Sequence, residues 1–294
     1  MIVKSRLSLR QVFAMTWRVD ILMLAFCVFI YYIDAYVFVK FTMPIGYPAF
    51  MGTAIAFFIG FDNDQAYNRW WEARIVWGGI VNDSRTWARN LLAYSNNNEF
   101  NHRMIRRHVA FLYATVSSLR KDGSKVYLKY VDDADIVRIK DNEHIPNKLL
   151  QFQAEDLASL HCSGALNDFS FNSLNLILQN FCDGMGKSER INNTVFPITY
   201  VFFTRLFIWI FIALITSSLI ELVGINSVLL GWFSGFVFNV IHLNGQELVN
   251  PFVMGKMTVP IASISRNIEI NLLQMLNDPN VPKPLPLIDD AYSV

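Results

Sequence analysis

The sequence predicts an all-α membrane protein with four transmembrane helices and a helical cytoplasmic region. Three features predict this class: long uncharged apolar runs, a strongly uneven distribution of basic residues, and apolar residues at helical spacing between the runs. The composition agrees, since 53% of the 294 residues are hydrophobic and 17% are charged. In typical soluble domains, by comparison, roughly a quarter of all residues are charged.

The four apolar runs form two pairs, which predicts two transmembrane hairpins. They cover residues 21–39, 43–61, 206–220 and 222–246, and the only charge within them is Asp34. A helix of 19 residues is roughly 28 Å long, close to the ~30 Å hydrocarbon core of a bilayer. Residues 8–20 mix apolar and basic side chains, which predicts a short amphipathic helix at the membrane surface.

Basic residues predict the orientation of the spans. Of the 25 Lys and Arg residues, 23 lie in residues 1–20, 62–190 and 247–294, which leaves only Lys40 and Arg205 elsewhere. Positive charge favours the cytoplasmic side. We therefore expect a multi-pass protein of the inner membrane with both termini in the cytoplasm.

The middle of the chain has the pattern of a folded helical region. Apolar residues recur at helical spacing in 66–92, 102–119 and 168–189, while Gly123, the acidic run 132–135 and Pro146 indicate loops. Strand-like alternation is missing from the sequence. The predicted organisation is 1–61, amphipathic helix and first hairpin; 62–190, cytoplasmic helices; 191–246, second hairpin; and 247–294, cytoplasmic C-terminal segment.

The sequence argues against several other functions. A net charge of +1 makes nucleic acid an unexpected partner. The motifs of zinc peptidases, serine hydrolases, P-loop proteins and Rossmann enzymes are missing, so we expect no enzyme and no cofactor. The acidic run 132–135 lacks the glycine and terminal glutamate of a calcium loop, and His102 and His108 are expected on a solvated surface. No metal site is therefore predicted.

Arg103, Arg106 and Arg107 form a predicted basic helix face with two interpretations. The face is either solvated or paired with other side chains, or it contacts anionic lipids and attracts anions. The sequence leaves both open.

The second apolar run has the pattern of a pore-lining helix. Thr53, Phe57 and Phe61 recur at every fourth position, and their face continues into the polar residues Asp64, Gln65 and Asn68. A hydrophobic collar that leads into a polar stretch suits an ion pore. Plain helix packing is the alternative, since the run is rich in small residues. Asp62 lies about 100° from the Phe61 face and is expected to point into subunit packing.

Three stretches of this sequence resemble the bestrophins, including their bacterial members. They are AIAFFIGFDNDQAYNRWWEARIVWGGIVNDSRTWARNLL at 54–92, GKSERINNTVFPITYVFFTRLFIW at 186–209, and ELVNPF at 247–252 with SISRNIEINLL at 263–273. The resemblance implies a homopentameric ion channel with four spans per subunit and one central pore lined by the second helices. Eukaryotic members conduct chloride and are activated by calcium, whereas a bacterial member favours sodium.

The resemblance also assigns pore residues. The narrow neck of the family corresponds to Thr53, Phe57 and Phe61, although Thr53 stands where an aliphatic side chain is usual. A second, cytoplasmic constriction corresponds to Phe169. The acidic calcium clasp that follows the NPF motif in eukaryotic members is missing here, because no carboxylate occurs between Phe252 and Glu269. Calcium activation is therefore not expected.

The expected function is a passive channel for small inorganic ions, with chloride favoured over sodium. The positive edges of the Phe57 and Phe61 rings would favour anions, whereas the carboxylate of Asp64 would favour cations. The competing hypothesis is a membrane transporter or enzyme. Transporters have repeated halves and ionisable groups at membrane depth, and the two hairpins here share no visible similarity.

Overall fold

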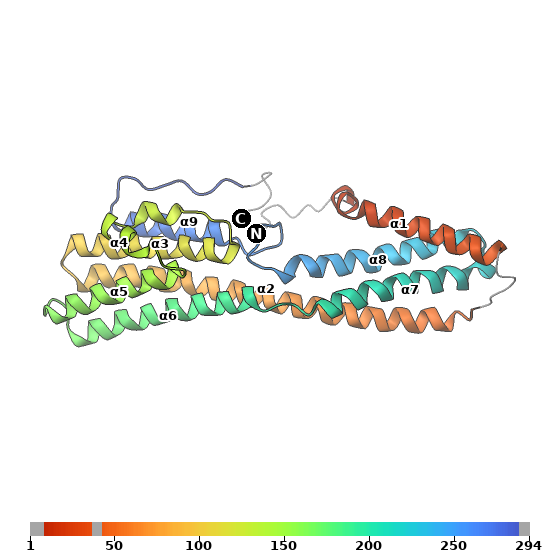
Figure 1. The fold of residues 1–294 in the computed structure, drawn as a ribbon, viewed down its shortest axis with the longest axis horizontal. Helices are drawn as coiled ribbons and strands as arrows, with labels where there is room; N and C mark the ends of the chain where they lie inside the picture. The colour runs from red at the N-terminus through yellow and green to blue at the C-terminus, as the bar shows by residue number, and fades with distance from the viewer. Residues whose placement is uncertain (1–8, 37–42, 288–294) are drawn as a thin grey trace. The chain divides into compact units, whose positions relative to one another are not determined.

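The computed structural model describes residues 9–36 and 43–287, and its regular elements in these ranges are all helices (Figure 1). The described residues divide into two units. The apolar unit contains 9–36, 43–69 and 195–249, and the α3 unit contains 70–194 and 250–287. The two ends of the chain, predicted to be cytoplasmic, and Lys40 lie outside the described residues.

The apolar unit contains α1 (Leu9–Tyr36), the first part of α2 (Gly46–Tyr94), α7 (Ile198–Val223) and α8 (Asn226–Val249). Within the described residues, three stretches are long and apolar enough to cross a membrane: Phe13–Asp34, Ile198–Val223 and Asn226–Val249. The run 43–61 falls at the start of α2, where glycines, prolines and a tyrosine dilute the apolar side chains. The total of four spans therefore stays a prediction.

Two helices continue past the ends that the sequence pattern predicts for them. The amphipathic segment 8–20 was expected to be a separate helix, but α1 continues from it without interruption to Tyr36. Residues 9–36 contain no glycine or proline, so nothing in the local sequence ends the helix. Likewise, α2 runs past residue 61 to Tyr94. The four-segment organisation of the chain stays a prediction.

Glycines determine how closely α7 and α8 pack. A Cβ atom at Gly231 would meet the Thr216 side chain, and one at Gly235 would meet Ile212. Small residues four positions apart allow helices in lipid to approach closely. The turn between these helices uses Gly224, whose φ of 58° suits glycine. The sequence thus builds a tight hairpin from α7 and α8, with α1 packed beside both (Figure 1).

The α3 unit is built around α3 (Asn98–Arg120), which is buried along most of its length. The other elements are the second part of α2, the 3₁₀ helix η1 (Val126–Tyr130), α4 (Asp133–Ile139), α5 (Ile145–Cys162), α6 (Asp168–Asn193) and α9 (Ile261–Met275). Its core contains the large buried side chains Trp77, Trp87, Phe111, Phe152 and Phe181. Side chains cap three helices, since Asn97, His144 and Asn167 accept hydrogen bonds from the first turns of α3, α5 and α6.

Candidate pore-lining site

Helix α2 has one face that the other described residues leave uncovered. Thr53 is exposed on this face, together with Phe57 and Phe61, whose exposed fractions are 65% and 52%. The opposite face carries Ile55 and Ile59, which are buried in the core of the apolar unit. The three neck candidates therefore lie together on a face that remains available for a pore or for another subunit.

The two phenylalanines of this face contact each other. The ring centroids of Phe57 and Phe61 are 4.4 Å apart, and the ring planes meet at 84° in an edge-to-face arrangement. One ring therefore directs its positively polarised edge at its neighbour. The Thr53 hydroxyl donates a hydrogen bond of 3.0 Å to the Ala49 carbonyl, so its oxygen is left as an acceptor toward solvent.

The exposed face continues into polar residues. Asp64, Gln65 and Asn68 are all exposed, and Asn68 Nδ2 donates a hydrogen bond of 3.1 Å to Asp64 Oδ2. Asp62 lies elsewhere: it is buried and accepts a 3.1 Å hydrogen bond from the Thr204 hydroxyl of α7. Asp62 therefore points away from the exposed face and packs against its own chain, which leaves Asp64 as the carboxylate of that face.

A second polar contact joins α2 to α8. Asn63 Nδ2 donates a 3.2 Å hydrogen bond to the Ile241 carbonyl of α8. A Cβ atom at Gly245 would occupy the position of the Asn63 side chain. Sequence reasoning missed this contact, because the only local signal is a glycine in a helix that contains several others.

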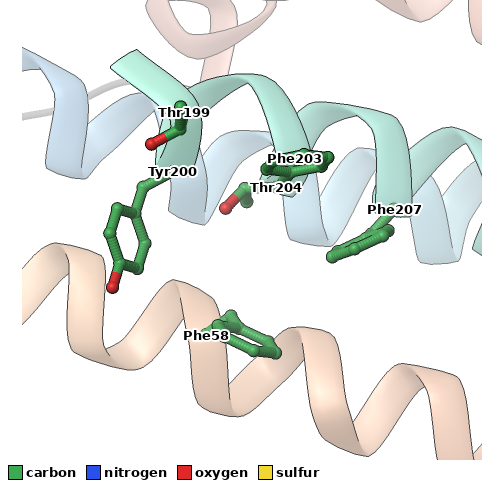
Figure 2. Close-up of a pocket in the computed structure, with 6 residues that line it drawn as sticks. All are labelled: Phe58, Thr199, Tyr200, Phe203, Thr204 and Phe207. Atoms are coloured by element: carbon green, nitrogen blue, oxygen red, sulfur yellow. The ribbon is translucent and has the colours of Figure 1, made fainter. Parts of the chain in front are cut away.

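Between α2 and α7 lies an apolar pocket of about 350 Å³ (Figure 2). Its lining comprises Phe58, Thr199, Tyr200, Phe203, Thr204 and Phe207. Figure 2 shows Phe58 directed from α2 toward the α7 side chains, and its ring centroid lies 6.5 Å from that of Phe207. Phe57 and Phe58 are neighbours in sequence but belong to different faces of α2.

Phe169 is the other candidate constriction residue. It is the second residue of α6 and is 89% exposed. The backbone around it is held by Asn167, whose side-chain oxygen accepts a 2.8 Å hydrogen bond from the Ser170 amide. An exposed phenylalanine on a capped helix terminus is available to form a ring with other copies of the chain.

The basic face of α3 is paired with carboxylates. Arg103 contacts Asp156 at 3.1 Å, and Arg106 lies 3.8 Å from Asp278. Arg107 is buried and contacts Asp135 at 2.5 Å and Asp156 at 2.7 Å. This arrangement favours the interpretation in which the arginines pair with other side chains.

The acidic run 132–135 is not the solvated loop that the sequence suggested. Asp132 precedes α4, which begins at Asp133, and Asp135 is buried against Arg107. A buried arginine needs a carboxylate partner, because an unpaired charge in the interior is costly.

His108 is also buried, although the sequence predicts that it lies on the surface. It is fully buried, its Nε2 lies 2.9 Å from the Ser84 hydroxyl, and its ring packs against Phe181. Burial lowers the pKa of His108 to about 3, because the interior penalises the charged imidazolium. The side chain is thus a neutral core residue.

The segment after the NPF motif folds back on itself without carboxylates. Phe252 is fully buried, and the Val259 amide donates a 2.8 Å hydrogen bond to the Pro251 carbonyl. The next carboxylate, Glu269, is buried and accepts hydrogen bonds from the hydroxyls of Tyr113 and Tyr130. Burial and the neighbouring Glu269 raise the pKa of both tyrosines, so they stay protonated donors.

Known proteins share both the sequence pattern and the fold of this chain. The family model described as bacterial/fungal bestrophin protein matches residues 8–274. The voltage-dependent anion channel-forming protein YneE of Salmonella typhi is 28% identical over 246 residues, which cover 83% of this chain and 80% of that protein. The protein of the same name from Escherichia coli K12 is 28% identical over 258 residues, with coverages of 87% and 84%. These names describe channel proteins rather than enzymes.

Solved structures agree on the fold. The crystal structure of a bacterial bestrophin homolog from Klebsiella pneumoniae aligns with a TM-score of 0.81 at 22% identity, over 87% of this chain and 97% of that chain. A second crystal structure, described only as a membrane protein, aligns with a TM-score of 0.84 at 22% identity, over 89% and 98% of the two chains. The helical fold and the matched family model together show that this chain belongs to the bacterial and fungal bestrophin family.

Proposed function

We propose that the chain is the subunit of a homopentameric anion channel in the inner membrane, with α2 of each copy facing a central pore. The observation that carries this proposal is the exposed face of α2, where Thr53, Phe57 and Phe61 lie opposite the buried Ile55 and Ile59. The relatives named as voltage-dependent anion channel-forming proteins support the same function.

In this proposal Thr53, Phe57 and Phe61 form the neck. Five copies would place ten phenylalanine rings around the axis, in a collar that offers ions no hydrogen bonds. An ion must then lose water without replacement, unless the collar widens, so the neck acts as a gate. In the edge-to-face contact of Phe57 and Phe61 one ring presents its edge and the other its face, and ring edges turned toward the pore axis would suit an anion better than a cation.

The polar residues below the neck provide a wet vestibule in this proposal. Asp64, Gln65 and Asn68 would hydrate ions that leave the collar, and Phe169 would form a second ring. A sodium channel of the same fold is the alternative, and the exposed carboxylate of Asp64 favours it. The amide of Asn68 donates a hydrogen bond to one Asp64 oxygen but is neutral, so the carboxylate keeps its negative charge.

We further propose that the channel conducts chloride and does not need calcium. Val253 to Pro260 supplies no carboxylate, and calcium binds 6–8 oxygen ligands with several carboxylates among them. The first carboxylate that follows, Glu269, is fully buried and engaged with two tyrosines. The proposal also includes the topology of the subunit: four spans, both termini in the cytoplasm, and the four-segment organisation of the chain.

Recordings from purified protein in planar bilayers test this function against the transporter hypothesis. We expect unitary current steps whose open probability is the same in a calcium chelator and in micromolar calcium. A saturable, stoichiometrically coupled flux in liposomes without unitary steps would instead identify a transporter. A large and reproducible activation by calcium would contradict the calcium-independent part of the proposal.

A further inference from the structure

The α3 unit contains an open groove between α2 and α9 that the proposed pore does not use. Its volume is about 440 Å³, and it is lined by Arg85, Arg89, Asn271, Gln274 and Met275. Pockets that hold small ligands have volumes of about 300–1,000 Å³. The groove is therefore large enough for a small molecule or ion.

Both guanidinium groups of the groove are paired with neutral oxygens. Arg85 donates from Nε and Nη2 to Asn271 Oδ1, at 3.2 and 3.0 Å. Arg89 donates from Nη2 to the Thr86 hydroxyl at 3.2 Å. Two like charges four residues apart on a helix repel each other, and a neutral oxygen does not cancel either charge. The described residues that line the groove include no carboxylate.

The remaining polar atoms of the groove are mainly hydrogen-bond donors. Because Asn271 Oδ1 accepts both bonds from Arg85, its Nδ2 group is the part of the amide that is left for a ligand. Arg85 and Arg89 keep further N–H groups, and Gln274 is exposed and can present its own amide. A site that offers forked cationic donors and amide donors fits an oxyanion.

We propose that this groove binds an oxyanion, either a phosphate or a carboxylate group, held by the guanidinium groups of Arg85 and Arg89 and by the Asn271 amide. The ligand is a small cytoplasmic anion or the phosphate of an anionic lipid, since both present the same oxygens. This binding site is separate from the pore neck, so it can exist whether or not the chain conducts anions.

Inorganic phosphate is the probe for the first test. Phosphate is titrated by calorimetry into the purified, full-length oligomer in uncharged detergent. Phosphate replaces chloride in the buffer, so that the ionic strength stays constant. The decisive variant is Asn271→Asp, which is nearly isosteric and places a carboxylate against Arg85. We expect this variant to raise the Kd for phosphate by about tenfold or more, a change of ~1.4 kcal/mol. The control Asn175→Asp makes the same charge change at an exposed position of α6 and should leave the Kd within about twofold.

A second set of variants separates the forked geometry from net charge. Arg85→Lys with Arg89→Lys keeps both charges but removes the guanidinium forks, so phosphate binding should weaken. Arg85→Gln with Arg89→Gln should abolish it. The matched control is Lys140→Gln with Lys187→Gln, which removes two exposed charges elsewhere in the same unit and should bind as the wild type does. Melting temperatures check that every variant is folded.

Nanodiscs distinguish the two sources of the oxyanion. If a lipid phosphate fills the groove, phosphatidylglycerol nanodiscs will prevent binding of inorganic phosphate, whereas phosphatidylcholine nanodiscs will permit it. If a free anion is the ligand, both lipids will permit binding. The proposal is overturned if phosphate shows no saturable binding to wild type in detergent. It is equally overturned if Asn271→Asp and Asn175→Asp bind phosphate alike, or if another copy of the chain covers the groove in the oligomer.

Discussion

At the scale of single residues, neighbouring side chains of the same type on α2 have different surroundings. Phe57 lies on the exposed face, whereas Phe58 faces the pocket beside α7. Asp64 is exposed, whereas Asp62 is buried against Thr204. Helical spacing predicts that Asp62 points away from the Phe61 face while Asp64 lies closer to it, and each pair supplies a variant with its own matched control.

Replacing both Phe57 and Phe61 by alanine should open the neck. Removing the rings widens and wets the collar, so the single-channel conductance or the open probability should rise and selectivity should weaken. Phe58→Ala is the control, since it removes the contact with Phe207 but leaves the exposed face intact. A double variant that assembles normally, by size-exclusion chromatography, and conducts as the wild type does would exclude the gate.

Neutralising Asp64 should strengthen anion selectivity. A unit negative charge about 4 Å away stabilises sodium and destabilises chloride by about 1 kcal/mol each in water, so Asp64→Asn should raise the chloride-to-sodium permeability ratio by roughly thirtyfold. Asp62→Asn should leave the ratio unchanged, because this carboxylate is buried in helix packing. Bi-ionic reversal potentials measure both ratios. An equal effect of the two variants would mean that Asp64 does not face the ion path.

His108 should make the fold sensitive to acid. Its pKa is about 3 in the folded protein and about 6.5 when unfolded, so the unfolded state binds the extra proton between these values. The stability is complete above about pH 6.5 and declines as the pH falls toward 3, by at most ~1.4 kcal/mol per pH unit. His108→Gln should flatten the dependence of melting temperature on pH between 7 and 4.5, whereas His102→Gln should not. Parallel curves for wild type and His108→Gln would contradict this assignment.

At the scale of elements, the sequence predicted helices better than it predicted their ends or partners. Apolar spacing placed α3 and α6, but α1 and α2 are longer than expected: α1 contains no glycine or proline, and α2 continues through Gly60 at the predicted boundary. The acidic run 132–135 has the local pattern of a loop, because the buried Arg107 that pairs with Asp135 lies on another helix. Local patterns cannot reveal a partner that is 28 residues away.

The turn between α7 and α8 tests the predicted orientation of the spans. In a background of Cys162→Ser and Cys182→Ser, we expect Ile225→Cys to be labelled by an impermeant maleimide in intact cells and Ser124→Cys to be protected. Both positions should be labelled after the membrane is permeabilised. The reverse pattern would contradict the orientation that the basic residues predict.

At the scale of the whole molecule, the family and the helical class could be predicted from the sequence, but the assembly could not. Small residues at Gly231 and Gly235, together with the apolar runs, account for helix packing within one chain. The exposed face of α2 indicates that something outside the chain must cover it or face it. Its residues do not determine how many copies do so, because that number depends on the angle between subunits.

The reversal potential of purified channels under a tenfold KCl gradient in a planar bilayer tests the central proposal most directly. A channel selective for anions should reverse near the chloride equilibrium potential, about 59 mV in magnitude for a monovalent ion. Reversal near the potassium potential, equal in magnitude and opposite in sign, would contradict an anion-selective pore. The absence of any current from correctly assembled protein at every voltage would contradict the channel itself.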